Sequence, residues 1–254
     1  MKKIVISYSG GLDSYILYHI CKQQNPTANI VCVYWDFGQE VAKQEVPRLP
    51  DFVEVRKLDW LNLKGKTPLG LKGRNEGNIF IAGRNLVLAT LLACEELAHE
   101  IWLGALYGEN HNKGTDKNDQ FLWQTNSTLN YVLSPFYDKE EKLVVRFPLV
   151  EMKLNKKDLT IWALSNGITQ EELKKTYSCH KGKDKQCGEC VQCVKRWAVF
   201  GSLGFYEVYD NNPKESDMAR AMYVEMKRTL DGGENPYYNQ ESINEVYDYL
   251  KTQF

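Results

Sequence analysis

Two short stretches of the sequence hold residue types that can carry out chemistry together. The first is the hexapeptide Ser9-Gly10-Gly11-Leu12-Asp13-Ser14, which follows the β-branched run Ile4-Val5-Ile6 and precedes apolar residues at helical spacing. Two adjacent glycines let the backbone turn tightly with its amide groups pointing inward, and the start of a helix adds partial positive charge. The hexapeptide is therefore predicted to be a phosphate-binding turn.

The polar side chains of this turn indicate what it binds. Ser9 and Ser14 can donate hydroxyl hydrogen bonds to a phosphate, whereas Asp13 would repel it unless a cation lies between them. We therefore expect Mg²⁺ to bridge Asp13 and a pyrophosphate group. The alternative is an ordinary turn in which Asp13 or Ser14 caps the helix. The turn has neither the glycine spacing of a dinucleotide fingerprint nor the ending of a Walker loop.

The second stretch is a cysteine cluster. Residues 187–193 contain two successive Cys-x-x-Cys steps, and a fourth cysteine lies eight residues upstream. Four thiolates suit tetrahedral Zn²⁺ and fill every ligand place, so we expect a structural site with His180 outside the ligand set. The alternatives are reduced cysteines without a metal and a redox Cys-x-x-Cys pair. The expected ligands are Cys179, Cys187, Cys190 and Cys193.

The remaining cysteines and the charge exclude other classes of protein. Cys21, Cys32 and Cys94 have apolar neighbours and are predicted to lie in the core. The formal net charge of −1 gives no basic field and no strong nucleic-acid signal. The longest apolar run, Leu86–Cys94, is too short to span a membrane, and no secretory signal follows the first residues. We therefore expect a cytoplasmic protein.

The elements that must position both stretches follow from the hydrophobic pattern. Apolar runs predict strands at 4–6, 30–34, 52–55, 101–106 and 143–146. Helices are predicted after residue 14 and at 86–97, 117–131, 155–165, 217–230 and 241–250, and the one at 86–97 is expected to be buried on most sides. This alternation predicts an α/β fold: a doubly wound, mostly parallel sheet in a nucleotide-binding domain, 1–150, and a helical, zinc-binding C-terminal region, 151–254.

The motif Ser-Gly-Gly-x-Asp-Ser after the first strand resembles the pyrophosphate loop of the ATP pyrophosphatase group. The resemblance implies that ATP is cleaved between its α and β phosphates while an oxygen of the substrate is adenylated. Asp36 and Phe37 follow the second strand, at the sheet edge where doubly wound folds bind nucleotides. The expected ATP contacts are Ser7, Tyr8, Ser9, Gly10, Gly11, Leu12, Asp13, Ser14, Asp36, Phe37, Gly83 and Arg84.

The loop and the Cys-x7-Cys-x2-Cys-x2-Cys cluster together are similar to the 7-cyano-7-deazaguanine synthase family of the queuosine pathway. The similarity runs from Lys3 to about Tyr206 and includes further motifs in the same order. These motifs are Phe37-Gly38-Gln39, Gly83-Arg84-Asn85, Pro148-Leu149 with Lys156-Lys157-Asp158-Leu159, Tyr177-Ser178-Cys179, and Arg196 after the last cysteine.

The resemblance implies a ligase that adenylates the carboxylate of 7-carboxy-7-deazaguanine and, with ammonia, converts it through the amide to the nitrile. The expected catalytic residues are Ser9, Asp13, Ser14, Arg84 and Lys156, and the expected substrate contacts are Gln39, Asn85 and Asp116. From the residues alone, Arg84 has the alternative of a surface ion pair and Lys156 that of a solvated basic face.

Two segments depart from the family pattern. Within Glu109–Asn118 only Asp116 is retained from a stretch that lines the family's acceptor pocket. Release of the amide, or another carboxylate acceptor, is therefore an open alternative, beside tRNA thiolation and a silent nucleotide-binding protein. The tail after Tyr206 extends past the family's usual ending. We expect it to form either a surface for a homodimer or another partner, or an extra helical layer.

Overall fold

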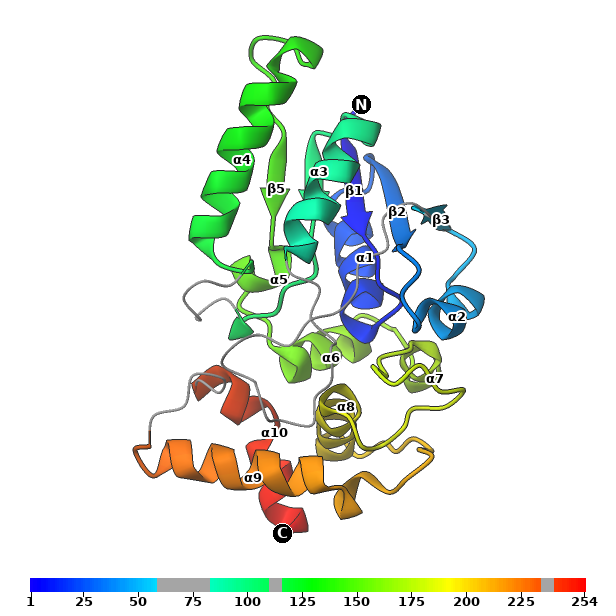
Figure 1. Ribbon diagram of the computed structural model, residues 1–254, viewed down its shortest axis with the longest axis vertical. Helices are drawn as coiled ribbons and strands as arrows, with labels where there is room; N and C mark the ends of the chain where they lie inside the picture. The colour runs from blue at the N-terminus through cyan, green and yellow to red at the C-terminus, as the bar shows by residue number, and fades with distance from the viewer. Residues whose placement is uncertain (59–82, 110–115, 234–239) are drawn as a thin grey trace.

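A computed structural model of the chain shows a parallel β-sheet between two layers of helices (Figure 1). The structure describes residues 1–58, 83–109, 116–233 and 240–254. The strands run in the order β3-β2-β1-β4-β5, and each neighbouring pair is parallel. They are β1 (Lys3–Ser7), β2 (Asn29–Asp36), β3 (Val53–Lys57), β4 (Glu100–Trp102) and β5 (Val144–Arg146). The predicted doubly wound, mostly parallel sheet is thus confirmed.

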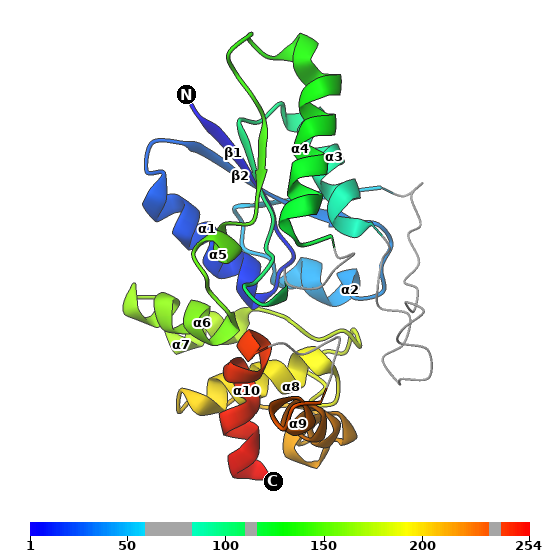
Figure 2. The same ribbon diagram turned by 90° about the vertical axis from the view of Figure 1, so that its left-hand side faces the viewer.

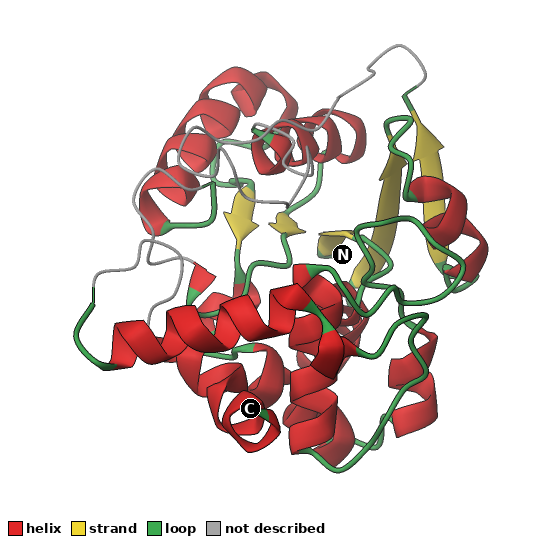
Figure 3. Cartoon of the chain, turned by 60° about the horizontal axis from the view of Figure 1, so that its bottom comes forward, coloured by secondary structure: helices red, strands yellow, loops and turns green. Residues whose placement is uncertain are grey.

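Helices connect the strands and form the C-terminal part. The longer ones are α1 (Leu12–Gln24), α3 (Arg84–Glu96), α4 (Asp119–Leu133), α6 (Lys156–Ser165), α7 (Gln170–Lys175), α8 (Val191–Ser202), α9 (Asp217–Leu230) and α10 (Gln240–Gln253). The short ones are α2 (Ala42–Glu45), α5 (Pro148–Glu151) and the 3-10 turns η1 (Val46–Arg48), η4 (Ser134–Phe136) and η5 (Pro213–Glu215). Figure 3 shows helices packed around much of the sheet.

Two clusters of buried side chains hold the layers together. Successive residues of a strand point to opposite faces, so Ile4 and Ile6 join one cluster while Val5 joins the other. The first cluster extends through α1 and α6 to α8, α9 and α10, and the second lies under α3 and α4. The first cluster includes residues on both sides of position 150, so one core spans the predicted domain boundary. The division of the chain into two domains at this position stays a prediction.

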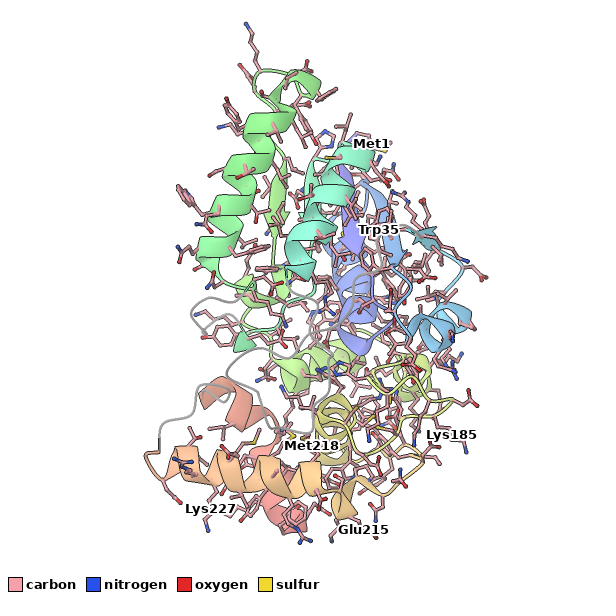
Figure 4. All side chains as sticks on the ribbon, in the orientation of Figure 1. Met1, Trp35, Lys185, Glu215, Met218 and Lys227 are labelled. Carbon is pink, nitrogen blue, oxygen red and sulfur yellow. The ribbon has the colours of Figure 1, made fainter. Side chains whose placement is uncertain are left out.

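The helices α8, α9 and α10 gather at one end of the molecule (Figure 2). Met218 and Lys227 lie near the two ends of α9 (Figure 4). Met222 and Met226, between them in the sequence, are buried. These side chains pack in the first cluster, so the tail forms an added helical layer. No helix among the described residues is long and apolar enough to cross a membrane.

Three details differ from the sequence-based expectations. β4 ends at Trp102, because the N–H of Ala105 turns back to bond the carbonyl of Leu103, although the residues up to Leu106 stay mostly buried. Only one stripe of α3 faces the sheet, so Leu86 is 47% exposed and the expectation of a helix buried on most sides was wrong. Cys94 lies on the outer side of α3 and is exposed, which contradicts its predicted core position.

The edge strand β5 has an unusual partner. The side-chain amide of Asn126 accepts from the N–H of Val145 at 2.7 Å and donates to its carbonyl at 2.9 Å. Asn130, one turn later on α4, makes the same pair of bonds with Leu143 at 3.0 and 2.8 Å. The two amides therefore satisfy backbone groups that an edge strand otherwise leaves open for another chain.

Candidate functional site

The glycine turn lies at the carboxyl end of β1, and its hydroxyls are bonded within the turn. Gly10 has a φ of +78°, a left-handed conformation that favours glycine. The Oγ of Ser14 accepts from the N–H of Ser9 at 3.2 Å and donates to the carbonyl of Gly11 at 3.0 Å. Gly11 is the N-cap of α1 and no side chain caps it, so the alternative of an ordinary cap by Asp13 or Ser14 is wrong.

A second helix begins at the same edge of the sheet without a side-chain cap. The N-cap of α3 is Gly83, with a φ of +69°, whereas α4 and α6 are capped by the side chains of Asn118 and Asn155. The N-cap glycines of α1 and α3 thus supply no side-chain acceptor at the edge where open α/β sheets bind ligands.

Asp13 and Lys156 connect the turn to α6. The Nζ of Lys156 lies 3.2 Å from Oδ2 of Asp13, and the lysine side chain is only 6% exposed. The alternative of a solvated basic face at Lys156 is therefore wrong. The other carboxylate oxygen of Asp13, Oδ1, is buried and has no hydrogen-bond partner in the part of the chain that the structure describes. A buried, unpaired carboxylate oxygen fits a ligand of Mg²⁺.

The start of α3 is joined to the segment before α4. The backbone N–H of Asn85 donates to Oδ2 of Asp116 at 3.2 Å, and the Asn85 side chain donates to the Asp116 carbonyl at 3.0 Å. Lys117 pairs with Glu109 at 2.9 Å. Burial raises the pKa of Glu109, but the charges of Lys117 and Lys195 outweigh burial and hold this pKa at about 2. Residues 110–115 of the divergent stretch lie outside the described residues.

The site residues that were predicted at the end of β2 make contacts within their own turn or in the core. The Gln39 amide accepts from the N–H of Phe37 at 2.6 Å and donates to the Tyr34 hydroxyl and the Trp35 carbonyl, so it closes its own turn. The Phe37 ring is 4% exposed and packs in the second cluster. Asp36 accepts from the N–H of Gly38. The predicted ATP contacts of Asp36 and Phe37, and the substrate contact of Gln39, stay predictions.

Glu45 of α2 is a site neighbour that the sequence does not reveal. Its carboxylate accepts from the Tyr34 hydroxyl, and a Cβ atom placed on Gly10 would lie 3.8 Å from Cβ of Glu45. Burial raises the pKa of Glu45 to about 7, against the opposing effects of the Tyr34 hydrogen bond and the Arg84 charge. Glu45 follows Phe37 by only eight residues, but no motif marks it.

The four cysteines converge as a metal site would require. Their Sγ atoms all lie within 4.8 Å of one another and all four residues are buried, with Cys187 and Cys193 sulfurs 3.8 Å apart. Sulfurs about 3.8 Å apart are expected around an ion with tetrahedral Zn–S bonds of about 2.3 Å. Gly188 has a φ of +77°, and a Cβ there would lie 1.9 Å from the Asn211 carbonyl oxygen, so only glycine fits. The cluster can therefore bind a metal such as zinc.

Arg196 connects this cluster to the rest of the C-terminal part. Its guanidinium is 1% exposed and bonds Glu207 through both Nε, at 2.7 Å, and Nη2, at 2.5 Å. It also donates to the hydroxyls of Thr176 and Ser178 and to the carbonyl of Leu173. These bonds fix the segment that leads into Cys179. Arg196 was part of the family motif, but its partner Glu207 has no sequence signal.

His180 follows the first cysteine and lies near the cations of the site. Its Nδ1 is buried and lacks a hydrogen-bond partner within the described ranges. Burial, together with the charges of Arg84, Lys156 and Lys117, lowers the pKa of His180 to about 4, although the Cys179 sulfur opposes this shift.

The parallel sheet, the uncapped glycine turn and the adjoining four-cysteine cluster define an α/β protein with its candidate site at the carboxyl ends of the strands. The sequence comparisons narrow this class. The family model described as queuosine biosynthesis protein QueC matches residues 3–204, and the chain belongs to this family. The resemblance expected from the motifs is thus confirmed.

Individual relatives are distant but match over nearly their whole length. The 7-cyano-7-deazaguanine synthase of a Nitratiruptor species is 26% identical over 224 residues, which are 80% of this chain and 95% of that protein. The synthase of the same name from Campylobacter hominis is 27% identical over 219 residues, which are 78% of this chain and 94% of that protein. These names indicate an enzyme.

A solved structure described as a predicted subunit of tRNA methyltransferase, from Methanocaldococcus jannaschii, aligns with a TM-score of 0.39. The two chains are 15% identical, and the alignment covers 64% of this chain and 75% of the chain in the solved structure.

Proposed function

We propose that this enzyme converts 7-carboxy-7-deazaguanine to 7-cyano-7-deazaguanine, with ATP as the activating substrate and ammonia as the nitrogen source. The observation that carries the proposal is the Asp13–Lys156 pair beside the uncapped glycine turn. Among the described residues, it combines a helix start that no side chain caps, a buried ammonium and a carboxylate oxygen without a hydrogen-bond partner, in a chain from this family.

In the first half of the reaction, a carboxylate oxygen of the acceptor attacks the α-phosphorus of ATP. The bond from this phosphorus to the oxygen that bridges the α and β phosphates breaks, and pyrophosphate leaves. The N–H groups of the glycine turn stabilise the charge that develops on pyrophosphate, and Lys156 adds a buried positive charge. Ammonia then attacks the activated carbonyl carbon, AMP leaves, and the surplus proton passes to solvent, which yields the amide.

In the second half, the amide oxygen attacks a second ATP in the same way. Loss of the second AMP and of the remaining N–H protons leaves the nitrile. Each nitrile therefore requires two ATP and releases two AMP and two pyrophosphate. Arg84 stands exposed at the start of α3, where its planar guanidinium is suited to hold a phosphate or a carboxylate.

Two metals belong to the proposal. Asp13 Oδ1 would hold Mg²⁺, which would supply charge neutralisation on the pyrophosphate. The four cysteines would hold Zn²⁺ as a structural ion, because four thiolates leave no open position for a substrate.

Mass spectrometry of the product tests the proposal. The protein is incubated with ATP, Mg²⁺, ammonium and 7-carboxy-7-deazaguanine, and AMP is counted beside the base. A nitrile with two AMP per base supports the proposal. An amide with one AMP would mean that this chain stops halfway, and an unchanged base would exclude this acceptor.

A further inference from the structure

We propose that His180 binds the carboxylate of the acceptor through its Nδ1–H group and is a specificity-determining residue of the site. This inference rests on the proposed function and deepens it, since it assigns a contact for the acceptor to a residue outside the glycine turn.

The first observation is a buried nitrogen without a partner. The Nδ1 atom of His180 is shielded from solvent, and no described residue bonds it. Buried polar atoms in proteins are nearly always hydrogen-bonded, so an exception at a site indicates a group whose partner arrives with a ligand. The Oδ1 atom of Asp13 is a second such exception. Each of the two side chains has the charge of Lys156 nearby.

The second observation is that the backbone of His180 is held in place. Cys179 precedes it, and the N–H of the following residue, Lys181, bonds the Cys179 sulfur at 3.4 Å. Tyr177, on the other side, donates its N–H to the Gly10 carbonyl at 3.0 Å. The imidazole is thus carried by a segment anchored to both the cysteine cluster and the glycine turn, as a recognition residue needs to be.

The third observation concerns the charges around the imidazole ring. The positive charges that act on the ring come from Arg84, Lys117 and Lys156, which lie in three separate segments of the chain, and the Cys179 sulfur is a negative group that acts on it. In the proposed complex that sulfur is a metal ligand. A group with a carboxylate or phosphate oxygen is therefore favoured at Nδ1.

The position of Lys117 favours the acceptor over ATP. The phosphates of ATP are assigned to the glycine turn, which Asp13 connects to Lys156. Lys117, by contrast, directly follows Asp116, and the bonded pair of Asn85 and Asp116 carries two of the three predicted substrate contacts.

Three variants of His180 separate a hydrogen bond from mere packing. The side-chain amide of Asn reaches the position of Nδ1, that of Gln reaches the position of Nε2, and Phe keeps the ring without either nitrogen. The probes are 7-carboxy-7-deazaguanine and its neutral 7-cyano counterpart, titrated calorimetrically into metal-loaded protein, with ATP titrated separately. The metal content of each variant is measured as the control for folding of the cysteine cluster.

We expect His180→Phe and His180→Gln to weaken binding of the carboxylate by about 10- to 100-fold, the loss of one hydrogen bond to a charged group. His180→Asn is expected to stay within about threefold of the parent, and the neutral probe and ATP to bind all forms alike. Unchanged carboxylate binding in His180→Phe would overturn this inference alone. If His180→Phe weakened the binding of ATP and not that of the carboxylate, Nδ1 would be assigned to phosphate, and this result would also overturn the inference. A parent protein that binds no carboxylate probe would overturn both this inference and the proposed function.

Discussion

The backbone N–H of Tyr177 donates to the carbonyl oxygen of Gly10 at 3.0 Å. This bond joins the segment that leads into the cysteine cluster to the turn that is predicted to bind phosphate. The carbonyl of Tyr177 also lies 3.6 Å from the place where a Cβ on Gly11 would stand. The C-terminal part therefore supports the turn directly, and a change at the cysteines is expected to reach it.

Removal of the metal tests this support. Cys190→Ser removes one of four thiolates, so the bound metal should be lost, and with it much of the soluble protein, because binding energy at a structural site is folding energy. Elemental analysis and solubility of the variant measure both effects. Cys94→Ser, which changes the exposed cysteine of α3, is the matched control and should keep the full metal content. A metal-free Cys190→Ser protein with parental solubility and turnover would contradict a supporting role.

The pair of Asp13 and Lys156 is predicted to be essential for ATP cleavage. Asp13→Asn keeps the shape but removes the charge opposite a buried ammonium, and pyrophosphate release should fall by about 100-fold or more. Acceptor-dependent pyrophosphate release is the measurement. The control is Asp158→Asn, an exposed acidic residue in the first turn of α6, which should leave the rate unchanged. Equal rates in Asp13→Asn and the parent would remove Asp13 from the mechanism.

Removal of one partner of the buried Arg196–Glu207 pair is predicted to lower the free energy of unfolding. Glu207→Gln leaves an uncompensated charge on a guanidinium that is 1% exposed, so the free energy of unfolding should fall by about 3–5 kcal/mol. Urea unfolding measures the change. Glu171→Gln, in an exposed pair with Lys174, should cost less than about 0.5 kcal/mol. Similar losses for the two variants would show that burial of the Arg196 pair has no special effect.

The raised pKa of Glu45 is expected to make the free energy of unfolding depend on pH. Its pKa is raised from 4.5 to about 7 in the folded protein, so the folded state binds a proton more tightly than the unfolded state. Stability from this group is complete below pH 4.5 and is lost as the pH rises to about 7. Relative to Glu45→Gln, the parent should lose at most about 3 kcal/mol of unfolding free energy between pH 5 and pH 8. Parallel pH profiles of the two proteins, in urea unfolding, would contradict the raised pKa.

The parts of this protein that were predictable from sequence are those whose chemistry is local. The glycine turn and three of the four cysteines each lie within seven consecutive residues, and strand alternation predicted the parallel sheet. Glu207, in contrast, acquires its role only when the chain folds back onto Arg196. The need for glycine at position 188 likewise depends on the distant Asn211. The exposure of Cys94 depends on which face of α3 meets the sheet, and an almost uniformly apolar helix does not specify that face.

The central claim is that a carboxylate oxygen of the acceptor is adenylated, and the transfer of that oxygen is the most direct test. 7-Carboxy-7-deazaguanine labelled with ¹⁸O at both carboxylate oxygens is converted in unlabelled water, and the AMP is analysed by mass spectrometry. We predict one ¹⁸O atom in each AMP and none in the nitrile, because each activation passes one oxygen to phosphorus. AMP without ¹⁸O, formed at the same rate as the product, would contradict the account.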